Sequence, residues 1–359
     1  MTAPSPSTAS SAVVHPATVH PRAQVRRAGV SSWVGLGVLA LLVLVAPVAP
    51  YVLPRGTQGS LTTLFALIVM ATMWNLLAGY GGMLSVGQQA YIGLGAYGLV
   101  MLSDKVGLDP FMAVPVAVVV AGLVSVPISF LAFRLAGGYF AIGTWVIAEV
   151  IKLVSEQVPV LGGGIGITFR GFSELSPGRR IAYVYWLSLA GVVVAVAVTY
   201  LLMRSRLGLG FTAVRDDTTA AASLGVDVTR SKRVVFVVAA MGSGLAGAII
   251  AANTLRVQPD SIYSVNYAVF MIFMVIIGGI GTIEGPILGA VLFFALQQWL
   301  SDLGAWYLVI LGVVAIAVTL FLPAGLWGLL SGRGRFRVFP VGYTLVPHVP
   351  PGVGTTHDG

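Results

Sequence analysis

The sequence lacks cysteine and has few charged residues. Without cysteine there can be no disulfide, no thiol nucleophile and no thiolate metal ligand. Charged residues make up 9% and hydrophobic residues 57% of the 359 positions, whereas soluble domains carry about 25% charged residues. The histidines all fall in the terminal tails, at His15, His20, His348 and His357. This composition is typical of a protein that is embedded in lipid and has no acid–base or metal chemistry in its membrane part.

Nucleotide-binding motifs are also missing. No G-x-x-x-x-G-K-[ST] motif occurs, and none of the lysines, Lys105, Lys152 and Lys232, follows a glycine. We therefore expect the chain itself to bind no ATP and no other cofactor or metal. A G-x-G-x-x-G pattern at 93–98 lies inside an apolar span, where its glycines favour close helix approach. The net charge of +8 comes from residues that flank apolar spans, so it does not indicate nucleic-acid binding.

Apolar segments follow one another through most of the chain. A membrane-spanning helix needs about 20 apolar residues. We expect an all-α integral membrane protein, a polytopic bundle of about ten transmembrane helices, with eight or nine as alternatives. The expected spans are 33–53, 61–81, 84–102, 111–133, 139–158, 182–203, 234–254, 264–282, 286–300 and 304–322.

The distribution of basic residues predicts the orientation. With both termini in the cytoplasm, 13 of the 20 Lys and Arg residues lie inside, 6 lie outside and Lys152 lies within a span. This bias favours an even number of spans. Residues 1–28 have no apolar periodicity and are expected to form a disordered cytoplasmic tail. A transmembrane permease domain is expected at 29–332, followed by a basic, disordered tail at 333–359.

Two glycine-rich segments, 79–89 and 278–286, are candidates for broken helices. Each has two adjacent glycines, then Ser or Thr, then another Gly. Interrupted helices expose backbone groups that can bind a zwitterion within the membrane, and close helix packing is the alternative interpretation. The residues expected to line a translocation path here are Gly79, Gly81, Gly82, Ser85, Gln88, Gln89, Gly278, Gly279, Gly281 and Thr282.

Acidic residues within the spans are a further candidate for the path. Charges at membrane depth are costly and often functional. Glu149 and Lys152 are three residues apart, so they can pair on one helix face. Glu284 lies in the second glycine-rich segment. Glu149 and Glu284 are interpreted as path-lining residues. In the alternative interpretation, Glu149 forms an internal ion pair with Lys152 and Glu284 lies at a helix boundary.

The polar loop 204–233 carries six basic residues between two spans. Acidic residues at its centre can cap a short helix, the alanines at 220–222 favour that helix, and Gly225 is placed to end it. We expect this helix to dock against another protein, with a plain connector as the alternative. The expected docking residues are Arg215, Asp216, Asp217, Ala220, Ala221, Leu224 and Gly225.

Several segments resemble the membrane permeases of ATP-binding cassette importers, and in particular the LivM-type members of the branched-chain amino acid permease family. They include NLLAGYGGMLSVGQQAYIGLGAY at 75–97, AVRDDTTAAASLGVDVTRSK at 213–232 and IIGGIGTIEGPILGA at 276–290. The resemblance covers about residues 60–330. The importer pattern Glu-Ala-Ala, three residues, then Gly has Thr219 here in place of Glu. Gln88 stands where such permeases more often have His.

The resemblance implies the partners and the mechanism. It implies a heterodimer with a second homologous permease, two cytoplasmic ATPase subunits that bind ATP and Mg, and an extracytoplasmic binding protein at the plasma (inner) membrane. The implied substrates are branched-chain or other hydrophobic amino acids, with urea or short amides as an alternative. The coupling helix, at about 215–226, is expected to move the spans near 75–97 and 276–290, and this chain needs no catalytic residue. The rival hypotheses are an ion-coupled secondary carrier that uses Glu149 and Glu284, a membrane enzyme and a passive channel.

Overall fold

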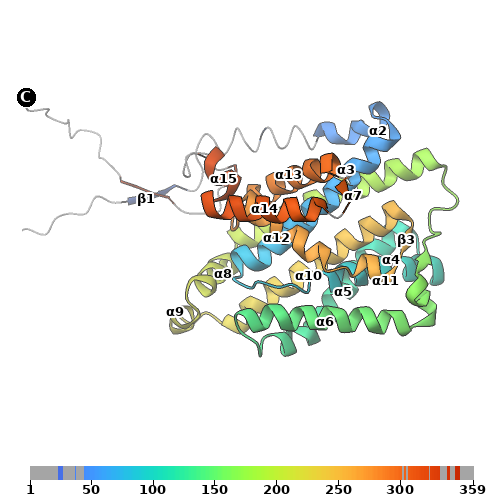
Figure 1. Ribbon diagram of the computed structural model, residues 1–359. Helices are drawn as coiled ribbons and strands as arrows, with labels where there is room; N and C mark the ends of the chain where they lie inside the picture. The colour runs from blue at the N-terminus through green and yellow to red at the C-terminus, as the bar shows by residue number, and fades with distance from the viewer. Residues whose placement is uncertain are drawn as a thin grey trace, which may run out of the picture.

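The computed structural model describes residues 23–26, 37, 44–300, 303–304, 306–322, 324–331, 338–339 and 344–347. These residues form a helical bundle with two short strand pairs (Figure 1). The expected all-α polytopic fold is therefore confirmed. Six of the described helical stretches are long and apolar enough to cross a membrane, namely Arg55–Tyr80, Pro110–Ala132, Gly138–Gln157, Pro177–Arg204, Val228–Thr254 and Pro259–Gly278. Of the expected span 33–53, the structure describes residue 37 and residues 44–53, so the count of ten stays a prediction.

The elements divide by length. The long helices are α3 (Arg55–Asn75), which continues as the π-helix η2 (Leu76–Tyr80), α5 (Pro110–Ala132), α6 (Gly138–Gln157), α7 (Pro177–Arg204) and α10 (Val228–Thr254). The intermediate helices are α4 (Gln89–Val100), which continues as the π-helix η3 (Met101–Lys105), α8 (Arg206–Asp216), α12 (Asn266–Gly278), α13 (Glu284–Leu300) and α14 (Trp306–Phe321). The short helices are η1 (Ala46–Val48), α2 (Ala49–Val52), η4 (Pro159–Leu161), η5 (Gly163–Ile165), α9 (Thr218–Ser223), α11 (Pro259–Ile262) and α15 (Gly325–Leu330).

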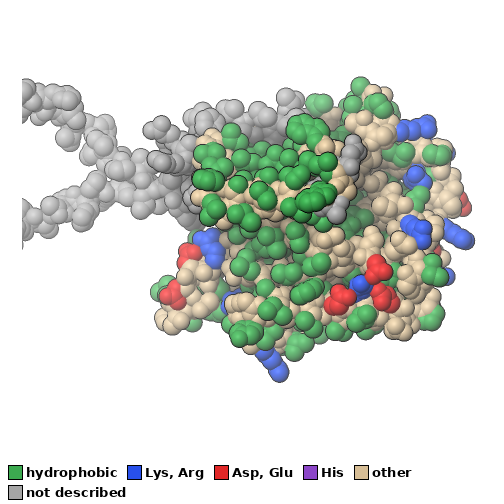
Figure 2. All heavy atoms as spheres, viewed as in Figure 1, with side chains coloured by type: hydrophobic (Ala, Val, Ile, Leu, Met, Phe, Trp, Pro, Cys, Tyr) green, Lys and Arg blue, Asp and Glu red, His purple; other side chains and the backbone are tan. Residues whose placement is uncertain are grey.

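Two antiparallel strand pairs lie at opposite ends of the bundle. Strand β1 (Ala23–Arg26) pairs with β4 (Thr344–Pro347), and β2 (Ile167–Thr168) pairs with β3 (Arg256–Val257). Figure 1 shows β1, α8, α9 and α15 at one end, and β3 at the other. The described parts of both tails, β1 and β4, therefore share an end with the loop 204–233. Figure 2 shows hydrophobic side chains over much of one face, with basic residues mostly toward its two ends.

Both glycine-rich segments interrupt helices, as the sequence suggested. Residues 81–88 separate η2 from α4, and residues 279–283 separate α12 from α13. Gly82, Gly279 and Gly281 have φ values of +67°, +124° and +76°, which residues with a side chain rarely adopt. The expected span 84–102 is helical only from Gln89 onward, and α4 continues into η3. Residues 84–88 of that span are irregular backbone, and Ser85, Gly87 and Gln88 among them are buried in protein, where such backbone is tolerated at membrane depth.

The centre of the bundle is formed by α3 and α10, which pack against each other and against α4, α5 and α7. Gly95 of α4 faces the carbonyl of Gly244, and Gly247 of α10 faces the carbonyl of Ile92, with no room for a side chain at either glycine. The predicted role of the 93–98 glycines in close helix approach is confirmed at Gly95. In lipid such contacts replace the hydrophobic effect as the source of helix association.

Replacing Gly95 by Ala is expected to loosen the contact between α4 and α10. The added methyl group overlaps the backbone of Gly244, and overpacking of this kind costs about 1–3 kcal/mol. Gly59→Ala in α3 is the matched control, because nothing lies near that position and alanine favours a helix interior by about 0.5–1 kcal/mol. Thermal unfolding in detergent measures both variants. Equal midpoints for the two would contradict the packing described here.

Candidate functional site

The loop 204–233 folds into two consecutive helices, α8 and α9. The expected short helix is confirmed as α9, and Asp217 caps it by accepting hydrogen bonds from the N–H groups of Thr219 at 2.8 Å and Ala220 at 3.0 Å. Asp216 does not cap α9. It ends α8, and its carboxylate pairs with Arg215 at 2.8 Å. The sequence reading missed α8 and treated its residues as loop.

The C-terminal end of α9 is closed by a glycine turn. Gly225 has φ +82°. Its N–H donates to the carbonyl of Ala222 at 3.0 Å, and the N–H of Val226 donates to the carbonyl of Ala221 at 3.0 Å. This pair of bonds is a Schellman motif, so the expected stop at Gly225 is confirmed. Ala221 is 1% exposed and packs inward, whereas Leu224 is 82% exposed at the tip.

Arg215, in the last turn of α8, connects this loop to the first broken helix. Its Nη1 donates to the carbonyl oxygen of Gly79 at 2.9 Å, while its Nε donates to Asp216 at 2.9 Å. A Cβ placed on Gly82 would lie 3.1 Å from the Cγ of Arg215, and one placed on Gly281 would lie 3.5 Å from its Nη1. The Arg215 side chain therefore lies against both glycine-rich segments.

Asn75 joins the two broken helices to each other. Its Nδ2 donates to the carbonyl of Thr282 at 2.7 Å, and its Oδ1 accepts from the N–H of Gly281 at 2.8 Å. The Asn75 side chain is fully buried. We call Asn75, Gly79, Arg215, Gly281 and Thr282 the junction. Asn75 was not among the predicted site residues, although an amide inside the apolar run FALIVMATMWNLL was a signal for it.

Thr282 stabilises the second interruption from within. Its hydroxyl donates to the carbonyl of Gly279 at 2.8 Å and accepts from the N–H of Gly285 at 3.0 Å. These bonds satisfy backbone groups that the missing helical turn leaves free, which membrane depth requires. Gly278 packs directly against the backbone of Gly285, so α12 and α13 meet closely at the break.

The other path candidates lie in closed packing around residues 81–88. The carbonyl of Ser85 accepts from Trp74 Nε1 at 2.8 Å, and Oε1 of Gln88 accepts from the hydroxyl of Ser243 at 3.1 Å. Gln89 is 1% exposed, and Gly81 lies against Val235. These contacts seal the segment against α3 and α10 in this conformation. Their role in a path stays a prediction.

The intramembrane acidic residues fall into two separate places. The expected Glu149–Lys152 pair is confirmed at 3.6 Å, and Lys152 also lies 3.9 Å from Glu156 and 2.7 Å from Asp260 of α11. The sequence did not predict that Asp260 joins this cluster, because Asp260 lies far from Lys152 along the chain. The carboxylate of Glu284 accepts from the backbone N–H of Phe339 at 2.8 Å, which holds part of the C-terminal segment against α13. The described structure does not bring Glu149 and Glu284 together.

A family described as "Branched-chain amino acid transport system / permease component" matches residues 56–321. The chain belongs to this family. The matched range includes the junction, both interrupted helices and the α8–α9 loop. The protein is thus a multi-pass permease component of an ABC importer in the inner membrane, and the resemblance noted in its sequence is confirmed.

The permease is similar to curated transporters of more than one substrate. The high-affinity branched-chain amino acid transport system permease protein LivM of Escherichia coli (strain K12) is 28% identical over 317 residues, which cover 81% of this chain and 74% of that protein. The same-named protein of Salmonella typhimurium is 28% identical over 314 residues, covering 80% and 74%. The L-arabinose ABC transporter permease protein AraH of Azospirillum brasilense is 26% identical over 297 residues, covering 78% and 85%. No solved structure matches the chain.

Removal of the Arg215 guanidinium is expected to loosen both interruptions of this permease. Arg215→Ala deletes a charged hydrogen bond to Gly79, an interaction worth about 1.5–3 kcal/mol. Hydrogen–deuterium exchange should therefore speed up at 79–88 and 279–283. Arg230→Ala, at another exposed arginine of the same region, is the control and should leave both segments protected. Unchanged exchange in Arg215→Ala would show that the bond does not hold the junction.

Proposed function

We propose that this permease carries branched-chain or other hydrophobic amino acids across the membrane, powered by separate ATPase subunits that dock on α8 and α9. The observation that carries the proposal is the contact of Arg215 with the junction. The Arg215 side chain therefore links a protein bound to the loop 204–233 to both interrupted helices. ATP and Mg are bound by the ATPases in this proposal, and this chain contributes no catalytic residue.

The docking surface consists of the α8–α9 turn and the tip of α9. Leu224 is 82% exposed and stands beside Gly225, around which there is open space. Asp216 is also exposed, with 66% of its side chain accessible. An exposed leucine beside a glycine turn and acidic residues suits a partner with an apolar groove and basic residues on its rim. The residues proposed to dock are Arg215, Asp216, Asp217, Ala220, Leu224 and Gly225. The predicted docking role of Ala221 is wrong, because its side chain is 1% exposed and packs inward.

Two observations support an amino-acid substrate, and one supports an alternative. The family description and the LivM relatives name branched-chain amino acids. The AraH relative names L-arabinose, so a sugar is the second candidate, and urea or short amides are a third. An ion-coupled carrier has less support, because Glu149 is held in the Lys152 cluster and Glu284 binds backbone. A two-state bundle driven by docking needs no titrating residue.

The proposed assembly contains a second homologous permease, as a heterodimer, two ATPases and an extracytoplasmic binding protein. In this assembly the α8–α9 end, with both tails, faces the cytoplasm. The excess of basic residues at this end supports that orientation. The pairing of β1 with β4 supports a common side for the two tails.

Placing a charge on the tip of α9 should detach the ATPases without unfolding the permease. Leu224→Glu is expected to abolish ATPase co-purification from the native cell in mild detergent, because a carboxylate cannot enter an apolar groove. Ile165→Glu alters a residue of similar exposure, 79%, in the connection after α6, and should retain the ATPases. A P-loop ATPase that still co-purifies with correctly inserted Leu224→Glu would contradict docking at this tip.

Two substitutions at Gly225 distinguish the effect of a bulky side chain on docking from the effect of backbone strain in the turn. Gly225→Asn tolerates the positive φ and should retain the ATPases, whereas Gly225→Trp should lose them because the ring fills the open space beside α9. Loss of the ATPases in both variants would assign the effect to the turn itself and not to a docked partner.

A further inference from the structure

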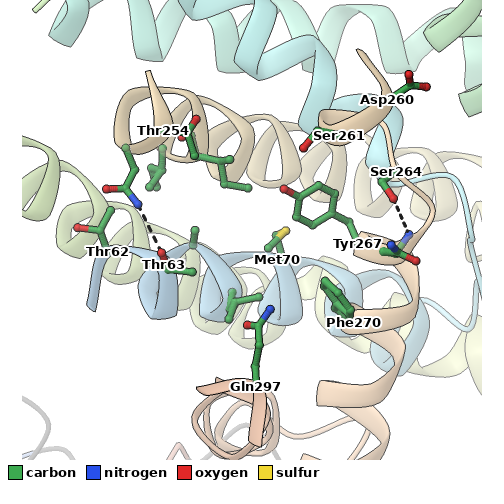
Figure 3. A pocket seen from close by; sticks show the side chains of 16 residues that line it. Thr62, Thr63, Met70, Thr254, Asp260, Ser261, Ser264, Tyr267, Phe270 and Gln297 are labelled. Carbon is green, nitrogen blue, oxygen red and sulfur yellow. Dashed lines mark hydrogen bonds between the residues drawn. The ribbon is translucent and has the colours of Figure 1, made fainter. Parts of the chain in front are cut away.

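A cavity of about 510 Å³ opens on the side of the bundle, between α3, α10, α12 and α13 (Figure 3). Its volume is in the range of small-molecule sites, about 300–1,000 Å³. None of the residues predicted from the sequence to line a path belongs to its wall. The cavity lies in the half of the bundle away from α9, with α11 at its rim.

One wall of the cavity carries polar groups that lack partners. Figure 3 shows Tyr267 of α12 and Gln297 of α13 pointing into the space. Within the described part of the chain, neither the Tyr267 hydroxyl nor the Gln297 amide makes a hydrogen bond. Asn253 of α10 reaches the hydroxyl of Thr63 at 3.4 Å, a long contact that leaves donor capacity on its amide. Lipid cannot satisfy such groups, so these donors need a polar ligand or water.

The floor of the cavity is apolar. Leu67 and Met70 of α3 are 4% and 1% exposed, and the partly buried ring of Phe270 closes the side toward α12. A ligand whose apolar group contacts this floor removes from water both its own apolar surface and that of the floor. The floor therefore favours a ligand with an aliphatic or aromatic group over a wholly polar one.

The rim of the cavity is acidic. Asp260 lies there with 82% of its side chain exposed, and its Oδ1 is 2.7 Å from Lys152 Nζ. The same ammonium group faces Glu149 and Glu156 at 3.6 and 3.9 Å. One positive charge thus stands against three negative charges, of which only Asp260 lines the cavity. Figure 3 shows the Asp260 side chain pointing away from the cavity, so the cluster attracts a cation toward the rim by its net charge.

We infer that this cavity is a binding site for a zwitterion with an apolar side chain. The Tyr267 hydroxyl and the Gln297 amide donate to the carboxylate, the negative rim near Asp260 attracts the ammonium group, and Met70 and Phe270 cover the apolar side chain. A sugar or urea has no group that matches this floor. The inference rests on the proposed function and places its substrate in the membrane part of this chain.

The test uses the complete importer in proteoliposomes, with binding protein saturated with [³H]leucine. The double variant Tyr267→Phe with Gln297→Met keeps the shape of the wall and removes its donors. Uptake of [³H]leucine is expected to fall at least about tenfold, because tenfold is about the loss for a single hydrogen bond to a charged ligand group and the variant removes two. ATP hydrolysis stimulated by the loaded binding protein should persist. Tyr139→Phe, at an exposed tyrosine of α6 outside the cavity, is the control and should retain uptake.

A second variant tests the rim. Asp260→Asn keeps an oxygen for Lys152 but removes the negative charge, and it is expected to lower uptake several-fold. Glu174→Gln neutralises an exposed carboxylate outside the cavity and should leave uptake unchanged. Wild-type uptake in both cavity variants would overturn the inference and leave the proposed function standing. ATP-driven uptake of [³H]arabinose, with none of [³H]leucine, by the wild-type importer would overturn both.

Discussion

The side-chain amide of Asn75 holds the two interrupted helices against each other, and the rest of the junction depends on it. The amide supplies one donor and one acceptor to consecutive backbone groups, the carbonyl of Thr282 and the N–H of Gly281. Those groups are outside the helical ladder because α12 stops at Gly278 and α13 starts at Glu284. At membrane depth no water replaces the lost helical partners, so the break is stable where a buried side chain satisfies them.

This constraint explains why one arginine can act on two helices. Because Asn75 brings Gly281 beside Gly79, the guanidinium of Arg215 contacts the region of both breaks at once. A rigid displacement of α8 and α9 therefore changes both interruptions together. If each interrupted segment contacted the loop through a different residue, either segment could relax alone. A single residue that contacts both segments favours two discrete arrangements of the bundle. The proposed ATPases need to move only the loop 204–233 to use this property.

Local chemistry made α9 predictable from sequence, because its cap at Asp217, its alanines and its Gly225 stop are all read within a few residues. The glycines also revealed both interruptions, since positive φ is a property of single residues. The sequence did not reveal Asn75 as the residue between them, because its partners lie about two hundred positions away. Asp260 was missed for the same reason: its bond to Lys152 links α11 to α6. The helix α8 was missed because Gly208 and Gly210 disfavour a helix interior and its charged residues are typical of a loop.

The cavity and the junction lie on the same two helices, α3 and α12. On α3, Met70 lines the cavity and Asn75 holds the junction. These two residues are about 7.5 Å apart along the helix axis, at a rise of about 1.5 Å per residue. On α12, Tyr267 and Phe270 line the cavity, and the helix ends at the break. A shift of α12 against α3 that opens the junction must therefore move the cavity walls apart or together. Since such coupling is reciprocal, a ligand that bridges Met70 and Tyr267 is expected to favour one arrangement of the junction, and the proposed docking at α9 is expected to change the affinity of the cavity in return.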